Sequence, residues 1–131
     1  MENQTHKLGV RVYYEDTDMA GIVYYANYLR YIERGRSEWV RDNGMDQNAM
    51  KEEGVVFAVR RVEADYLLPA KLDDELVVET DVMSVTAARM VMEQHVKRNE
   101  EVLFNAIVTV VCIGENGLPT RLPAKVRQMV H

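Results

Sequence analysis

Cysteine is nearly absent from this chain, which has only Cys112 among its 131 residues. A single cysteine cannot form an internal disulfide, and chains without disulfides are typical of reducing compartments. Cys112 has no second cysteine and no histidine near it in the sequence, which favours a buried apolar role over that of a nucleophile. The cysteine content therefore predicts a cytoplasmic protein.

Long hydrophobic runs are also missing. The longest, from Ala106 to Ile113, is interrupted by Thr109 and is far shorter than the roughly 20 apolar residues of a membrane-spanning helix. Residues 1–7 contain no apolar region of the kind that a secretory signal needs. We therefore expect no transmembrane segment and no secretory leader.

An excess of positive charge is lacking as well. The 16 Lys and Arg residues are outnumbered by 21 Asp and Glu residues, which gives a formal net charge of −5. Such a chain is not a general nucleic-acid binder, because those proteins are basic. A polyanionic small ligand would need a local group of cations.

The length and composition fit one globular domain, which we expect to span residues 1–131. The chain is 47% hydrophobic and 28% charged, as in ordinary folded proteins. A core of adequate size is feasible at this length. The sequence contains no repeat, low-complexity segment or linker.

The first third of the chain changes from a strand pattern to a helix pattern. Residues 8–15 are rich in Val and Tyr and predict a short strand, and residues 16–23 form an acidic, turn-rich loop. From Tyr25 onward, apolar residues recur at helical spacing until Asn43-Gly44, a typical helix end. Gly35 falls within the apolar stripe, which indicates that the helix packs closely on something flat. A shorter helix is predicted around residues 46–53.

The part of the chain after Gly54 has the pattern of strands. Four predicted strands follow one another at hairpin spacing, over residues 55–67, 76–85, 89–98 and 102–113. A short edge strand is also predicted at 120–126, limited by Pro119 and Pro123. One long helix with an antiparallel sheet of five or six strands makes an α+β domain, with the sheet wrapped around the helix. The apolar faces of 55–67 and 102–113 further predict that subunits pair.

The segment from Tyr13 to Arg36 combines three features that suit acyl transfer. Asp18 is a carboxylate in a loop just before the long helix, and Gly21 lets the backbone turn tightly. The first turn of a helix offers unpaired N–H groups and the positive end of the helix dipole. Such donors can stabilise the oxyanion that forms when a carbonyl is attacked.

This segment resembles the hotdog-fold acyl-CoA thioesterases of the hydroxybenzoyl-CoA thioesterase family, and most of all the Tol–Pal-associated acyl-CoA thioesterases of bacteria. The matching stretches are Arg11 to Asp18, Gly21 to Tyr25, Tyr28, Glu33 to Arg36, Phe57 to Arg60 and Pro69 to Asp74. The resemblance implies a β-α-β-β-β-β hotdog fold and hydrolysis of acyl-CoA to a free acid and CoA. It also implies active sites at a dimer interface, often a homotetramer built of two dimers, and a possible link to the cell-envelope Tol–Pal machinery.

Carried over residue by residue, the resemblance makes Asp18 the catalytic carboxylate, acting as nucleophile or as general base. The backbone N–H at Tyr25, with Gly21 shaping the loop, would polarise the thioester carbonyl. Members of the Tol–Pal-associated group usually have His where this chain has Tyr25, whereas the hydroxybenzoyl group has Tyr. Coenzyme A belongs to the substrate, so no cofactor is expected.

Other interpretations of the same residues exist. Asp16 and Asp18 are placed to cap the helix, and we assign that role or loop hydrogen bonding to Asp16 alone. The spacing of a calcium loop fails because its fifth and twelfth positions would be Ala20 and Asn27, so no metal site is predicted. Glu33 lies about 12 Å along the helix from Tyr25, too far to serve the same carbonyl, and is expected to pair with an arginine such as Arg36.

Three functions remain open. Thioester hydrolysis is the leading one, ahead of an acyl-thioester hydratase or dehydratase, which pairs Asp with His, and of a non-catalytic interaction module. For the phosphates of CoA, the sequence offers candidates without choosing among them: Arg60, Arg61, Arg89, Lys97, Arg98 and Arg121.

Overall fold

The fold consists of an antiparallel sheet and one long helix. The computed structural model describes residues 4–129; residues 1–3 and 130–131 of the expected domain lie outside that range, and so does part of the stretch 1–7, for which no leader is expected. The elements in chain order are β1 (His6–Arg11), a 3-10 turn η1 (Tyr14–Asp16), α1 (Asn27–Asp42), α2 (Gln47–Glu52), β2 (Val56–Tyr66), β3 (Glu75–Val85), β4 (Met90–Arg98), β5 (Glu101–Ile113), β6 (Pro119–Thr120) and α3 (Ala124–Arg127).

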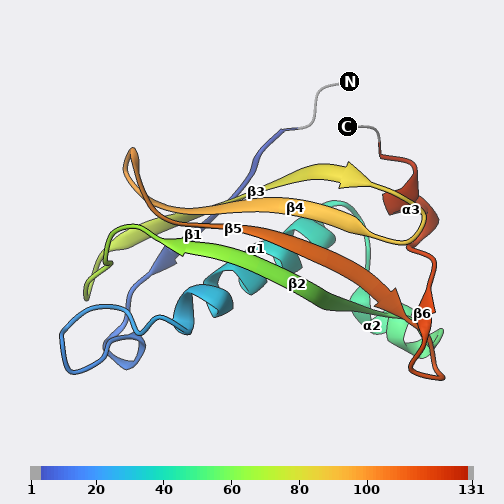
Figure 1. Ribbon diagram of the computed structural model, residues 1–131, viewed down its shortest axis with the longest axis horizontal. Coiled ribbons are helices and arrows are strands. Elements are labelled where there is room, and N and C mark those ends of the chain that lie inside the picture. The colour runs from blue at the N-terminus through green and yellow to red at the C-terminus, as the bar shows by residue number, and fades with distance from the viewer. Residues whose placement is uncertain (1–3, 130–131) are drawn as a thin grey trace.

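The strands form one curved sheet in the order β1-β3-β4-β5-β2, and the short β6 pairs with β5 (Figure 1). Every pairing is antiparallel. The long helix α1 packs against β1, β3 and β4 on one face of the sheet. This arrangement confirms the predicted α+β class, the antiparallel sheet of five or six strands, of which there are six, and the central position of the helix.

Helix α1 packs on the sheet through the apolar stripe that the sequence predicts. Its buried residues are Tyr28, Tyr31, Ile32, Gly35, Trp39 and Val40. A methyl group added to Gly35 would lie 2.7 Å from Cγ1 of Val78 on β3, closer than carbon atoms approach without a shift. Gly35 therefore lets the helix backbone come close to the sheet, as the sequence indicates. Leu29, which belongs to the same stripe, is 41% exposed.

A buried glutamine fixes where α1 lies along the sheet. The side chain of Gln94 on β4 is fully buried. Its Nε2 donates to the Ile32 carbonyl at 2.9 Å and to Oγ1 of Thr80 at 2.9 Å, while its Oε1 accepts from Nη1 of Arg36 at 3.0 Å. Because a buried amide without partners is costly, these bonds favour a single axial position of the helix.

Two segment boundaries differ from the sequence prediction. The strand expected at 8–15 ends at Arg11 and is followed by η1, and the helix expected from Tyr25 begins at Asn27. The edge piece expected at 120–126 exists only as the two-residue β6, and the rest of the prediction is wrong, because Ala124–Arg127 form the short helix α3, with Pro123 as its N-cap. Proline suits a helix start because its fixed φ fits there and no N–H is needed.

The expected end of α1, the short second helix and the buried position of Cys112 are confirmed. Gly44 has a φ of +77° and follows the end of α1, while Asp46 caps α2 by accepting from the N–H groups of Asn48 and Ala49. Strand β5 lies inside the sheet, between β4 and β2. Cys112 on β5 is fully buried, and burial raises the pKa of its thiol to about 11. Across residues 4–129, the structure contains no helix with the length and apolarity needed to cross a membrane.

We predict that Gly35→Ala destabilises the fold. Alanine gains about 1 kcal/mol over glycine in a helix, but overpacking a tight contact costs about 1–3 kcal/mol. The buried, β-branched Val78 cannot easily move away, which places the overpacking cost in the upper half of that range, so we expect a net loss of about 1–2 kcal/mol of unfolding free energy. Denaturant unfolding at a fixed protein concentration measures it.

Gly9→Ala is the matched control, because nothing lies within 4 Å of a methyl group added there. It should change the unfolding free energy by no more than about 0.5 kcal/mol. A Gly35→Ala protein as stable as the Gly9→Ala protein would contradict the close-packing account.

Candidate active site

Asp18 lies in a tight loop whose two sides pair with each other. Thr17 and Val23 form an antiparallel bridge, and the N–H of Asp18 donates to the Ile22 carbonyl at 2.9 Å. The N–H of Gly21 donates to the Asp18 carbonyl at 2.9 Å, and Gly21 has a φ of +78°. Other residues rarely adopt that conformation, so Gly21 permits the turn that joins the two sides.

The carboxylates of Asp16 and Asp18 have different surroundings. Oδ2 of Asp16 accepts from the Tyr13 N–H at 2.9 Å, and its carbonyl accepts from the N–H of Tyr24 and from Nδ2 of Asn27, each at 2.9 Å. Asp18 is exposed, and its Oδ1 accepts only a local bond from the Ala20 N–H at 2.9 Å. Asp16 therefore holds the loop, as predicted, while the Asp18 carboxylate faces solvent.

Two backbone N–H groups precede α1 and have no acceptor within residues 4–129. These are the amides of Tyr25 and Ala26, whereas the next amide, that of Asn27, donates to the Tyr24 carbonyl at 2.8 Å. Tyr25 lies two residues before the first helical residue rather than at the helix start. The free donors therefore belong to the turn that enters the helix, directly after the loop of Asp18.

Tyr66 supports this turn from the end of β2, a contact that the sequence did not indicate. Its hydroxyl donates to the Tyr25 carbonyl at 3.2 Å. Burial, followed by the nearby Tyr25 and Tyr28, raises the pKa of Tyr66, so the phenol keeps its proton at neutral pH. Tyr25 itself is 61% exposed; its ring lies tilted against that of Tyr24 and edge-on to that of Tyr66, with ring centroids 5.0 and 6.0 Å away.

A cluster of aromatic rings lies behind the turn. Tyr28 stacks on Phe104 with centroids 5.1 Å apart, and Tyr66 packs edge-on against both rings at 5.6 and 4.9 Å. The Tyr28 hydroxyl accepts from the Ala70 N–H at 3.0 Å, and the Ala70 carbonyl accepts from the Val23 N–H at 2.9 Å. The helix and the loop of Asp18 are thus joined through Ala70. The Pro69 to Asp74 match had marked this segment in the sequence, but gave it no role.

Glu33 does not form the expected bond with Arg36. Its carboxylate accepts from the hydroxyl of Ser37, while Arg36 donates to Gln94. Burial lowers the pKa of Arg36, and the charge of Glu33 partly offsets this effect. Both side chains line a cavity of about 180 Å³ between α1 and the strands, whose apolar wall includes Trp39 and Phe57.

The cations proposed for CoA phosphates divide into two groups. Lys97 pairs with Glu79 at 3.1 Å, Arg61 lies 3.5 Å from Glu63, and Arg98 binds two carboxylates. For Arg60, Arg89 and Arg121, no carboxylate of residues 4–129 lies within 4.0 Å, and all three are exposed. Over the same range the structure shows no group of three or more His, Cys, Asp or Glu side chains that could hold a metal ion.

This arrangement has the parts needed for attack on an acyl carbonyl. An exposed carboxylate can attack the carbon or remove a proton from water. Backbone N–H groups without an acceptor can bind the oxygen on which negative charge develops. No described histidine contacts the loop: His6 bonds to Asp42, and His95 lies 3.9 Å from Glu93.

Comparison with known proteins gives the family. The sequence model of the Thioesterase-like superfamily matches residues 12–130. The chain is 42% identical to the Acyl-CoA thioesterase YbgC of Haemophilus influenzae, over 93% of this chain and 91% of that protein. It is 39% identical to the Acyl-CoA thioester hydrolase YbgC of Escherichia coli, over 91% and 93% of the two chains.

Solved structures agree with this relationship. The crystal structure of a Probable Thioesterase from Bartonella henselae has 39% identity and a TM-score of 0.88, covering 92% of this chain and all (100%) of that one. A 1,4-dihydroxy-2-naphthoyl-CoA thioesterase from Synechocystis shares the fold at a TM-score of 0.85, with 22% identity and over 90% of each chain covered (93% and 92%). From its sequence and its fold, the chain belongs to the thioesterase-like superfamily of hotdog proteins.

Proposed function

We propose that this protein hydrolyses acyl-CoA thioesters to a free carboxylic acid and CoA at the loop of Asp18. The observation that carries the proposal is the exposed Asp18 carboxylate in a loop that is followed by two amides with no acceptor in the described part of the chain. The names of the relatives that are about 40% identical (42% and 39%) over nine-tenths of the chain support the same reaction.

The reaction follows from what each group can do. Asp18 attacks the thioester carbon as a nucleophile, or removes a proton from the water that attacks it. The N–H groups of Tyr25 and Ala26 bind the carbonyl oxygen as it becomes negative. The C–S bond then breaks and CoA leaves as a thiolate, which takes up a proton from water or from the protonated Asp18. Where Asp18 removes a proton from water, the water oxygen enters the acid directly. Where Asp18 is the nucleophile, the acyl group stays bound to it as a mixed anhydride, and a water molecule then hydrolyses this bond, which releases the acid and frees the Asp18 carboxylate. CoA is part of the substrate, and we propose no cofactor or metal.

The phosphates of CoA need cations that are not already paired. Arg60, Arg89 and Arg121 meet this requirement within the described chain, whereas Lys97 and Arg98 are held by carboxylates. A β-bulge between Val59 and Arg61 displaces Arg60 from the regular pairing of β2. We propose that the phosphates bind to a subset of these three arginines.

We also propose that β2 forms the interface of a homodimer. Val59, Val62 and Tyr66 lie opposite buried residues of β5, so they face the side of the sheet on which α1 lies. They nevertheless remain 45%, 39% and 47% exposed. Within residues 4–129, β2 pairs with β5 alone, and its other edge is open. A second copy paired at this edge would bury these side chains.

The two other functions have less support. A hydratase would need a histidine beside Asp18, and the two described histidines contact other carboxylates. A non-catalytic module would not need the free Asp18 carboxylate. A cytoplasmic location, a link to Tol–Pal and a tetramer stay predictions from the sequence.

We predict that Asp18→Asn loses several orders of magnitude in kcat for thiol release from acyl-CoA, each factor of ten being about 1.4 kcal/mol of barrier. Asp16→Asn and Glu33→Gln are the controls and should lose less, because these carboxylates serve the loop and Ser37. A panel of acyl-CoAs with a thiol reagent measures the rates. An Asp18→Asn enzyme with nearly wild-type turnover on the best substrate would exclude the mechanism.

We predict that Tyr25→Phe keeps most of its turnover. Residue 25 is proposed to act through its backbone N–H, which phenylalanine retains, and its side chain is exposed. Tyr25→Pro removes that N–H and should cost about 10²–10³ in kcat, provided that circular dichroism shows an intact fold. The rival role, a hydroxyl that replaces histidine, predicts a large loss in Tyr25→Phe and recovery in Tyr25→His. A hundredfold drop in folded Tyr25→Phe would support that rival.

We predict that light scattering finds a species of at least twice the 15.1 kDa chain mass at micromolar concentration. Val62→Glu would bring like charges into the β2 interface and should shift the protein towards the monomer with loss of activity. Met83→Glu is the control, since Met83 is also exposed, at 48% against 39% for Val62, but lies on β3. A monomeric wild-type protein, or an unaltered Val62→Glu dimer, would refute this interface.

A further inference from the structure

The loop of Asp18 is attached at both ends to one short segment, residues 69–74. Where the loop begins, the Val12 N–H donates to the Asp74 carbonyl and the Val12 carbonyl accepts from the Asp73 N–H, both at 2.9 Å. Where the loop ends, the Val23 N–H donates to the Ala70 carbonyl at 2.9 Å, and Ile22 bridges to Lys71. The position of the loop therefore depends on the position of this segment.

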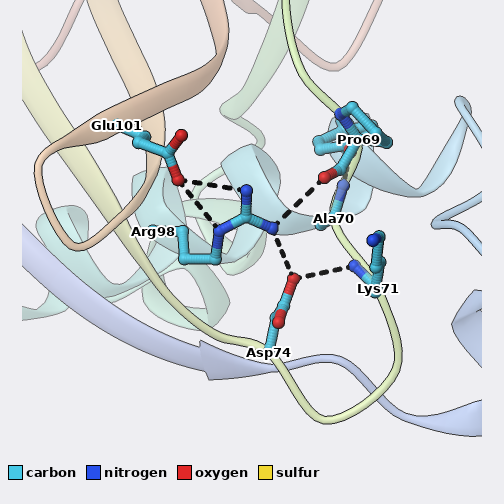
Figure 2. A network of polar contacts seen from close by, with 7 residues as sticks. Pro69, Ala70, Lys71, Asp74, Arg98 and Glu101 are labelled. Atoms are coloured by element: carbon cyan, nitrogen blue, oxygen red, sulfur yellow. Dashed lines mark hydrogen bonds and ion pairs between the residues drawn. The ribbon is translucent and has the colours of Figure 1, made fainter.

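The 69–74 segment belongs to no helix or strand, so no regular backbone ladder fixes it. It is held by side chains instead. Nη1 of Arg98 donates to the Pro69 carbonyl at 3.3 Å and to Oδ2 of Asp74 at 2.8 Å. The same Asp74 oxygen accepts from the Lys71 N–H at 2.8 Å. Figure 2 shows these contacts, in which one guanidinium and one carboxylate join the two ends of the segment.

Besides Pro69 and Asp74, the Arg98 side chain binds a third residue, Glu101. Its Nε and Nη2 both donate to Oε1 of Glu101 on β5, at 3.2 and 3.1 Å. The side chains of Arg98 and Asp74 are only 26% and 22% exposed, which reduces screening by solvent. A lysine could not make all of these contacts, because it lacks the planar fork of donors. The sheet, through Arg98, thus determines where residues 69–74 lie.

We propose that Arg98 is a positioning residue for Asp18, acting through Asp74 and the backbone of residues 69–71. The proposal rests on the proposed function, since it concerns the geometry of that site. It replaces the role of phosphate ligand that the sequence had left open for Arg98. A displacement of about 1 Å at a reacting group can cost about a hundredfold in rate, so we expect kcat to fall when the contacts of Arg98 are lost.

The pair should persist over the neutral pH range. Burial raises the pKa of Asp74, but the Lys71 N–H and the hydrogen bond and charge of Arg98 outweigh it, so the pKa lies below its usual range. Because the folded-state pKa is the lower one, the stabilisation is present above the ordinary aspartate pKa of about 4 and is lost as the pH falls below it.

The test compares Arg98→Gln, Arg98→Lys and Asp74→Asn with Lys97→Gln. Lys97 is the matched control, because it is the neighbouring cation on β4, equally exposed at 26%, and paired with Glu79 away from the segment. In Arg98→Gln we expect kcat for thiol release to fall about 10- to 100-fold, with KM changed less than about threefold. Arg98→Lys should recover part of kcat, and Lys97→Gln should behave like the wild type.

Hydrogen exchange provides a readout that does not depend on activity. The Val23 amide and its neighbours in residues 12–26 should exchange about tenfold faster in Arg98→Gln and Asp74→Asn, but not in Lys97→Gln. If Arg98→Gln does not fold, the Arg98→Lys and Asp74→Asn variants decide the question in the same way.

Two results would overturn the proposal. One is a folded Arg98→Gln protein with wild-type kcat or wild-type exchange in residues 12–26. The other is a raised KM at unchanged kcat, which would make Arg98 a ligand of CoA after all. A wild-type protein without thiol release would instead refute the proposed function, and the exchange experiment would still show whether Arg98 positions the loop.

Discussion

The structure depends on the close approach of α1 to the sheet at Gly35. Only a residue without a side chain leaves room for the backbone of the helix over Val78, and Gln94 then fixes the axial position by binding the Ile32 carbonyl. Gly35 and Gln94 together determine how close the 16-residue helix α1 lies to the sheet and where it lies along its own axis. Since the helix is rigid, the position of its N-terminal end follows from a contact two turns away.

The candidate site is arranged around that N-terminal end. The Tyr28 ring packs on Phe104, and its hydroxyl binds Ala70, which in turn binds Val23 at the end of the Asp18 loop. The loop is thus held between the helix and a segment that Arg98 ties to the sheet. Within residues 4–129, two amides and one carboxylate are left without strong partners, and we propose that this part of the structure binds and hydrolyses the substrate.

The local sequence pattern was enough to predict most of the helices and strands and the loop that carries Asp18, because hydrophobic periodicity and turn-forming residues act over a few positions. The stripe of α1, the strand runs and the motif around Asp18 and Gly21 are of this kind. The contacts that position the site join distant residues, such as Tyr66 with Tyr25, 41 positions apart, and Arg98 with Pro69, 29 apart. Only the fold brings them together. Helix α3 was missed because the composition of residues 120–126 resembles that of a strand and conceals the helix that follows Pro123.

A crystal structure of the Asp18→Asn variant with an intact acyl-CoA bound would show whether the thioester binds between residue 18 and the two amides. We expect the thioester oxygen to lie about 2.7–3.1 Å from the backbone nitrogen of Tyr25 or Ala26. We also expect the carbonyl carbon to face the side chain of residue 18. A thioester bound with its carbonyl away from both amides, or out of reach of residue 18, would refute the proposed roles of these groups.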